Sequence, residues 1–98
     1  MVKHMIIWKM SDAIENKTVA KAAIKEALEG LVGVVPGLLE MKILTEGFDC
    51  SAGDIMMDST LESKEALDAY QAHPAHQAVA NSIVRPAVCQ RLSFDYEV

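Results

Sequence analysis

The hydrophobic pattern of this chain changes period along the sequence in an order that few folds can accommodate. Residues 2–10 (VKHMIIWKM) are rich in strand formers, and their alternation places His4, Ile6 and Trp8 on one face. Apolar residues then recur at helical spacing across positions 19–31, after a possible helix cap at Ser11 or Asn16, with charged residues mainly on the opposite face. The chain therefore begins with a strand followed by an amphipathic helix.

The rest of the chain continues this alternation of elements. Residues 38–46 and 54–61 indicate two strands joined by a turn-rich loop. Ser63 can cap a short helix that runs through Tyr70, and Pro74 favours the start of a further helix reaching about Ile83. The final residues, 87–98, alternate like a strand. The predicted order is β-α-β-β-α(α)-β.

That order predicts an α+β fold of the ferredoxin-like split βαβ type, with an antiparallel sheet and helices on one of its faces. We expect one domain over residues 2–97. Both faces of the strands carry apolar residues, and 51% of the chain is hydrophobic, which is high for a small monomer. The sequence therefore predicts a homodimer that pairs through its sheets into an α+β barrel, with the strand at 87–97 contributing heavily.

The charge and the cysteine content limit which binding partners and which cellular compartment we expect. The net charge is −5, and the nine Lys and Arg residues are scattered, so neither nucleic acid nor an anionic membrane is an expected partner. Cys50 and Cys89 match no metal or redox spacing, which favours reduced thiols in the cytoplasm. The apolar run at residues 5–8 is too short for a signal peptide or a membrane span.

The most reactive side chains gather around Pro74. If Pro74 opens a helix, His76 lies in its first turn, on one stripe with Val79, Ala80 and Ile83. Burial and the positive end of the helix dipole both disfavour a charged imidazole there, so we expect His76 to be neutral near pH 7. A neutral imidazole can accept a proton.

Tyr70 precedes the proline corner and can converge with His76, directly or through one water. A phenol beside a neutral imidazole can polarise a carbonyl while the adjacent carbon loses a proton, which is acid–base catalysis without a cofactor. His4, on the strand face with Ile6 and Trp8, can complete a polar corner in an apolar pocket. We therefore predict His76, Tyr70 and His4 as catalytic residues.

Each of these residues also has a structural interpretation. An inward-facing His76 can simply hold a hydrogen bond, and Tyr70 can be a core aromatic residue with its hydroxyl at the rim. His73 can cap the helix or lie on the surface, or it can pair with His76 as a metal-binding i, i+3 couple. No second ligand pair at a zinc spacing accompanies them, so we expect neither a metal nor a cofactor.

Several segments of the chain resemble the stress-responsive A/B barrel family, known as Dabb proteins. The segments are VKHMIIWKM at 2–10, VPGLL at 35–39, LESKEALDAYQAHPAHQAV at 61–79 and RLSFDYEV at 91–98. The most specific part is the YQAHPAH stretch at 70–76. The resemblance covers essentially the whole chain, and it implies a ferredoxin-like monomer that pairs through its sheets into a dimeric barrel.

The resemblance also implies an activity like that of the plant olivetolic acid cyclases, polyketide cyclases that perform an intramolecular aldol condensation without a metal or an organic cofactor. The catalytic tyrosine and histidine of those enzymes fall on Tyr70 and His76, and a pocket histidine falls on His4. The predicted ligand pocket comprises Ile6, Trp8, Met57, Ser59 and His73. Apolar wall positions of the cyclases correspond here to Ser59, Lys64, Arg91 and Ser93, which implies a more polar ligand.

Two hypotheses about function follow. In the first, the protein binds a small, unidentified carbonyl compound, and the Tyr70 and His76 pair performs cofactor-free proton transfer or a cyclase- or lyase-type reaction. In the second, the protein is a non-catalytic, stress-associated dimer that binds a ligand or serves a structural role, and the same residues only order the helix corner. An open pocket of a few hundred cubic ångströms beside the pair is required by the first and not by the second.

Overall fold

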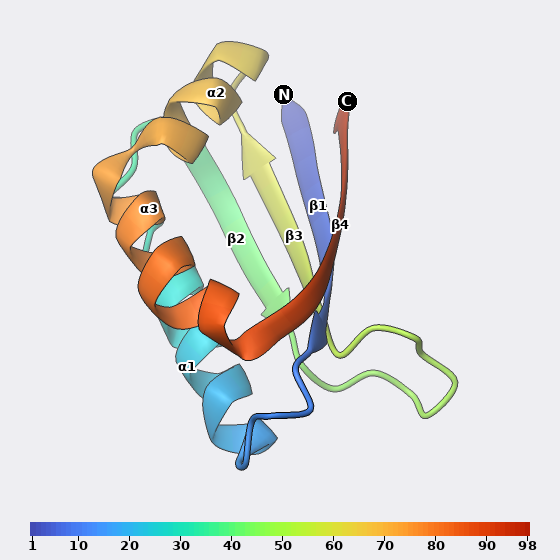
Figure 1. Ribbon diagram of the computed structural model, residues 1–98. Helices are drawn as coiled ribbons and strands as arrows, with labels where there is room; N and C mark the ends of the chain where they lie inside the picture. The colour runs from blue at the N-terminus through green and yellow to red at the C-terminus, as the bar shows by residue number, and fades with distance from the viewer.

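The computed structural model describes residues 1–98, and it shows one antiparallel sheet with all the helices on one face (Figure 1). The strand order is β2-β3-β1-β4. This architecture confirms the predicted ferredoxin-like α+β fold. None of the helices has the length and apolar content that a membrane span requires. The elements are β1 (Val2–Met10), α1 (Lys17–Glu29), β2 (Leu38–Leu44), β3 (Ile55–Leu61), α2 (Lys64–Ala72), α3 (Pro74–Val79), the π-helical turn η1 (Ala80–Val84), the 3₁₀ turn η2 (Arg85–Ala87) and β4 (Val88–Glu97).

Side-chain caps fix where the first two helices begin. The Asn16 side-chain oxygen accepts a hydrogen bond of 3.1 Å from the Val19 amide, so Asn16 rather than Ser11 starts α1. The Ser63 hydroxyl oxygen accepts one of 3.1 Å from the Ala66 amide at the start of α2. The cap predicted at Ser63 is therefore confirmed.

The corner between α2 and α3 is built from a histidine and a proline. His73 is extended, as the residue before a proline prefers to be, and this ends α2. Pro74 is the first residue of α3, where its missing N–H costs nothing. The His73 Nδ1 atom accepts a hydrogen bond of 3.0 Å from the Ala75 amide. This confirms the predicted helix start and the capping interpretation of His73.

The end of this helical region differs from the single helix predicted to Ile83. After α3 the chain widens into η1 and then tightens into η2. Pro86 provides the reason, because it has no N–H to donate and its ring would clash with the carbonyl of Ser82 in a regular α-helix. The last strand consequently begins at Val88, one residue later than predicted.

Alternation on β1 divides the sheet into two different faces. The helix-facing side chains of this central strand are all buried, and they belong to Val2, His4, Ile6, Trp8 and Met10. The apolar members pack against buried residues of α1, β2 and β3 to form one core. This confirms the face predicted for the first strand.

No helix covers the opposite face of the sheet (Figure 1). One row of paired residues crosses all four strands on this face and is entirely apolar: Leu92, Ile7, Met56 and Leu44. Phe94 lies two residues beyond Leu92 on the same side of β4, and both of these side chains are exposed. The sheet therefore has two apolar faces, as the sequence predicted, and only one of them is covered within the chain.

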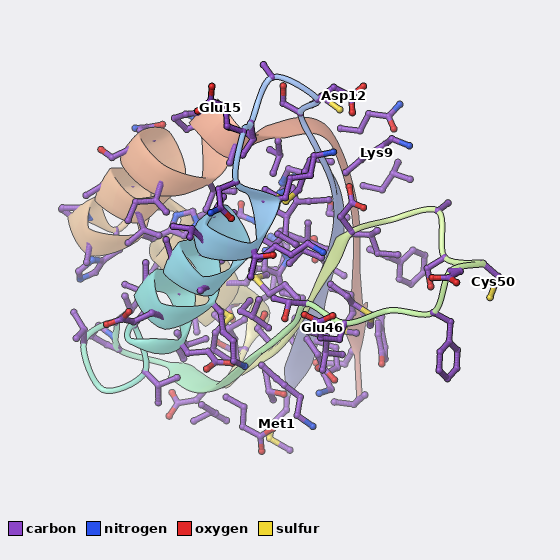
Figure 2. The ribbon with its side chains drawn as sticks, turned by 90° about the horizontal axis from the view of Figure 1, so that it is seen from below. Met1, Lys9, Asp12, Glu15, Glu46 and Cys50 are labelled. Atoms are coloured by element: carbon purple, nitrogen blue, oxygen red, sulfur yellow. The ribbon has the colours of Figure 1, made fainter.

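The two cysteines lie in different parts of the molecule, and both are free and exposed. Cys50 is at the tip of the long loop between β2 and β3, and this loop projects away from the helices (Figure 2). Cys89 lies at the start of β4, where the pairing with β1 shifts by one residue.

Two glycines before β2 have positive φ and differ in their surroundings, which provides a test of the packing of α2. A Cβ atom at Gly37 (φ +83) would lie 2.7 Å from the Ala66 Cβ atom, whereas a Cβ atom at Gly33 (φ +87) would meet nothing within 4 Å. We expect Gly33→Ala to lower the free energy of unfolding by about 1 kcal/mol through backbone strain, and Gly37→Ala by at least about 2 kcal/mol. Urea unfolding measures both, and equal losses would contradict the close approach of α2.

Candidate active site

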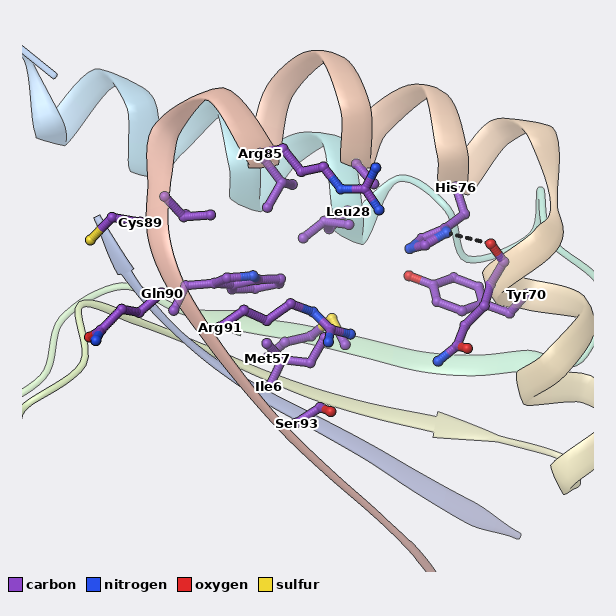
Figure 3. Close-up of a pocket in the computed structure, with 15 residues that line it drawn as sticks. Ile6, Leu28, Met57, Tyr70, His76, Arg85, Cys89, Gln90, Arg91 and Ser93 are labelled. Atoms are coloured by element: carbon purple, nitrogen blue, oxygen red, sulfur yellow. Dashed lines mark hydrogen bonds between the residues drawn. The ribbon is translucent and has the colours of Figure 1, made fainter. Parts of the chain in front are cut away.

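A pocket of about 610 Å³ opens between the sheet and the helical layer (Figure 3). Its floor is the helix-facing side of the sheet, with Ile6, Trp8 and Met57, and its roof includes Leu28 and Val84. The helices leave β4 uncovered, so the inward side of that strand lines the pocket. The sequence predicted Ile6, Trp8 and Met57 as pocket residues, and the structure places all three there.

His76 lies at one end of the pocket, with one ring nitrogen bound and the other free. Its Nδ1 atom is 3.3 Å from the backbone oxygen of Gln71. A carbonyl oxygen can only accept, so Nδ1 carries the proton and Nε2 keeps its lone pair. Figure 3 shows the second ring nitrogen turned toward the interior of the pocket. In this tautomer His76 presents a proton acceptor to a ligand.

The surroundings of His76 favour its neutral form. Burial lowers the pKa of the imidazole below its ordinary value of 6.5, and the charges of His4, Arg85 and Arg91 act in the same direction. The hydrogen bond to Gln71 opposes them without reversing the shift. The ring is therefore available as a base near pH 7.

Tyr70 lies beside His76 and is fully buried, with its ring centroid 4.3 Å from that of His76 and the two planes tilted by 44°. Tyr70 is one of the residues that line the pocket, and Figure 3 shows its hydroxyl directed toward the pocket; this oxygen is buried, and no protein group, His76 included, forms a hydrogen bond with it. Burial raises the pKa of the phenol far above its ordinary value. Tyr70 therefore stays protonated and offers a free hydrogen-bond donor to the pocket.

His4 and Ser59 lie behind this pair and do not line the pocket. The His4 ring is buried and meets Tyr70 edge-on at a centroid distance of 6.2 Å, while its Nδ1 atom contacts the Asp95 carboxylate on β4. The Ser59 hydroxyl donates a 2.7 Å hydrogen bond to the backbone oxygen of His4. The prediction of Ser59 as a pocket residue is therefore wrong, because its hydroxyl is engaged within the sheet, and His4 reaches a ligand only through Tyr70.

His73 also lies outside the pocket, which corrects its predicted place among the ligand residues. Its Nδ1 lone pair is occupied by the Ala75 amide, so the ring serves the helix cap. No group of three or more His, Cys, Asp or Glu side chains has an arrangement that could hold a metal ion. The pairing of His73 with His76 as metal ligands thus gains no third ligand.

The resemblance predicted polar side chains at four positions where the cyclases have apolar pocket walls. Only two of the four line the pocket in this structure. Arg91 and Ser93 line the pocket, while Ser59 and Lys64 do not. Sequence reasoning missed Arg85, which also lines it. Nine residues after His76 corresponds to about two and a half α-helical turns, so a regular helix would place Arg85 on the opposite face. The wide turn η1 changes that register, and the pattern gave no signal for it.

The fold and the site define a class of protein: a ferredoxin-like α+β domain with a ligand-sized pocket beside a tyrosine and histidine pair. The profile of the Dabb family, described as Stress responsive A/B Barrel Domain, matches residues 2–98. The stress-response A/B barrel domain-containing protein HS1 of Arabidopsis thaliana is 31% identical over 102 aligned residues, which span 98% of this chain and 88% of that protein. This chain belongs to the stress-responsive A/B barrel (Dabb) family, as its sequence indicated.

Solved structures share the fold over nearly the whole chain. A dimeric protein of unknown function with a ferredoxin-like fold from Bacteroides fragilis superposes with a TM-score of 0.89 at 24% identity, over 99% of this chain and 95% of that chain. A hydroxynitrile lyase from Passiflora edulis superposes with a TM-score of 0.82 at 17% identity, over 99% and 92% of the two chains. At these identities the likeness establishes the fold alone.

The protonation state of His76 can be measured directly. We expect its imidazole to titrate below pH 6.5 in a proton NMR titration, because burial disfavours the charged ring. The unfolded chain then binds the proton more readily, so the stability that His76 contributes is lost as the pH falls below about 6.5. A midpoint for His76 at or above 6.5 would contradict burial as the dominant influence on the pKa of this ring.

Proposed function

We propose that the pocket binds a small carbonyl compound and that His76 and Tyr70 transfer a proton at the carbon next to the carbonyl, without a cofactor. The observation that carries this proposal is the buried Tyr70 hydroxyl that has no partner in the protein. A buried donor without an acceptor costs about 1–3 kcal/mol, so a ligand oxygen placed there is stabilised. The free Nε2 atom of His76 lies at the same end of the pocket (Figure 3).

The reaction follows from the two side chains. The Tyr70 hydroxyl donates a hydrogen bond to the carbonyl oxygen, and His76 Nε2 takes a proton from the adjacent carbon. The electron pair of the broken C–H bond moves into the carbonyl group, which becomes an enolate. Tyr70 stabilises the developing charge on oxygen, and the imidazolium of His76 can return its proton to carbon or to a newly formed alkoxide.

An aldol-type cyclisation is the form of this reaction that we favour. The enolate carbon attacks a second carbonyl of the same molecule, a C–C bond forms, and His76 protonates the resulting alkoxide. A fold neighbour named as a hydroxynitrile lyase supports the compatibility of this fold with catalysis. The open pocket beside the pair favours a catalytic role over the purely structural interpretation of the two residues, which needs no cavity. We place the protein in the cytoplasm as part of the proposal, on the strength of its free cysteines.

Proton exchange at carbon tests the proposal before the natural substrate is known. A panel of small ketones and oxo acids in D₂O, followed by proton NMR, should include compounds whose α-hydrogens exchange faster with the protein than without it. His76→Ala should slow the catalysed exchange by roughly a hundredfold or more, as expected for the loss of a general base. Tyr70→Phe should slow it by roughly tenfold or more, because the enolate loses its donor.

A histidine outside the pocket provides the control. His73→Asn keeps a side chain that can accept from the start of α3, so the variant should fold and exchange like the wild type. Loss of exchange in His73→Asn to the same extent as in His76→Ala would contradict the assignment of the base. An exchange rate that no compound raises above the uncatalysed rate would contradict the proposed function.

We also infer that the protein is a homodimer that pairs through the face of the sheet that lacks helices. The apolar row across that face, from Leu92 to Leu44, is left without cover in the single chain. Three fold neighbours are described as dimeric, from Bacteroides fragilis, Thermobifida fusca and Jannaschia. Burying this row against a second copy would give both faces of the sheet a packing partner.

Matched substitutions separate this interface from other exposed apolar positions. We expect a mass of about twice 10.7 kDa in sedimentation equilibrium at micromolar concentration. Leu92→Lys should yield monomer, because a charge on this face would have to be buried. Val19→Lys, on the surface of α1, alters a side chain of similar exposure (62% against 75% for Leu92) and should leave the dimer intact. A monomeric wild type, or dissociation in both variants, would contradict the interface.

A further inference from the structure

Both arginines of the chain, Arg85 and Arg91, line the same pocket. The chain as a whole is acidic, with 14 Asp and Glu residues against nine Lys and Arg. None of the residues that line the pocket is Asp or Glu. The pocket is therefore a positively charged site on a negatively charged protein.

The two arginines reach the pocket from opposite walls. Arg85 belongs to η2 in the helical layer, whereas Arg91 belongs to β4 and is paired with Trp8 of the floor. Both side chains extend toward the end of the pocket where His76 and Tyr70 lie (Figure 3). Both positive charges also lower the pKa of His76, after the larger effects of burial and of His4, which agrees with this placement.

Neither guanidinium group has an acidic partner in the protein. The ion pairs of this chain use lysines, His4 or the N-terminus. Arg85 donates to the amide oxygen of Asn81, a neutral group, and Arg91 forms no side-chain hydrogen bond. Most of the donors on the two arginines are therefore free to bind a ligand.

The geometry points to a carboxylate on the ligand, bound by Arg91 with Arg85 opposite it across the pocket. The planar guanidinium of arginine matches a carboxylate through two parallel hydrogen bonds. The inference rests on the proposed function for the position of the carbonyl group, which Tyr70 binds. The substrate class is then an oxo acid whose apolar body lies on Ile6, Trp8 and Met57.

The floor of the pocket favours a carboxylate over a phosphate ester. Ile6, Trp8 and Met57 offer no hydrogen-bond donor at the floor except the indole N–H of Trp8. A phosphate ester carries close to two charges, and the second would be desolvated against this apolar surface. A carboxylate carries only one negative charge, so its binding beside this apolar surface requires less desolvation.

Binding of matched acids and amides tests the inference without any turnover. Titration calorimetry would compare 4-oxo and 5-oxo acids of five to ten carbons with the corresponding uncharged oxo amides, on the full chain. We expect the best acid to bind roughly tenfold or more tightly than its amide, from a charge-assisted hydrogen-bonded pair. Arg91→Gln should remove most of this preference, and Arg91→Lys should restore part of it, because lysine keeps the charge and loses the planar fork.

Three comparisons make the outcome decisive. Lys17→Gln removes one positive charge from the exposed surface of α1 and should leave the preference for the acid unchanged. Acids that never bind more tightly than their amides, or a preference that survives both Arg91→Gln and Arg85→Gln, would overturn the inference. Inorganic phosphate that competes as well as the best acid would also overturn it, since the site would then be a general anion site.

Failure here is distinguishable from failure of the proposed reaction. The His76→Ala variant should still bind the acid more tightly than the amide, because His76 does not bind the carboxylate. A preference for acids without any proton exchange would leave a carboxylate-binding pocket and remove the catalytic proposal. Exchange on neutral ketones that equals exchange on oxo acids, with equal affinity, would keep the catalytic proposal and remove the carboxylate.

Discussion

The two-residue alternation of β1 is the constraint on which both the fold and the site depend. β1 is the strand between β3 and β4, so each of its side chains has a neighbour on both sides. Its even-numbered residues face the helices, where they form part of the core, the floor of the pocket and the buried His4. Its odd-numbered residues supply Ile7 to the uncovered apolar row. A shift of register by one residue would exchange the two faces and destroy the core, the pocket and the open face together.

The second requirement is the break at His73 and Pro74. The break ends α2 just after Tyr70 and starts α3 just before His76, so the two side chains come from different helices and meet across the corner. A continuous helix would separate residues six apart by more than one and a half turns and place them on different faces. Burial then shifts the two pKa values in opposite directions, raising that of Tyr70 and lowering that of His76. It keeps the phenol protonated and the imidazole neutral, which is the pairing of acid and base that enolate formation requires.

Much of this arrangement could be predicted from the sequence, because it depends on local rules. Strand alternation placed Ile6 and Trp8, and the position of Pro74 placed His76 in the first turn of α3. What could not be predicted depends on deviations from regular geometry and on competition between hydrogen bonds. The wide turn η1 brings Arg85 to the pocket against its helical register, and the Ser59 hydroxyl turns to a backbone oxygen instead of the cavity. Side chains on the inward face of β4 line a pocket only because the helical layer stops short of that strand.

The central claim is that a neutral His76 is the base that removes a proton from carbon beside the Tyr70 hydroxyl. The most direct test is the pH dependence of the catalysed α-proton exchange, compared with the NMR titration of His76 in the same protein. If the claim is right, the exchange rate rises with pH along the deprotonation curve of His76, with the same midpoint below 6.5, and levels off above it. A rate profile whose midpoint differs from that of His76, or one that persists unchanged in His76→Ala, would contradict it.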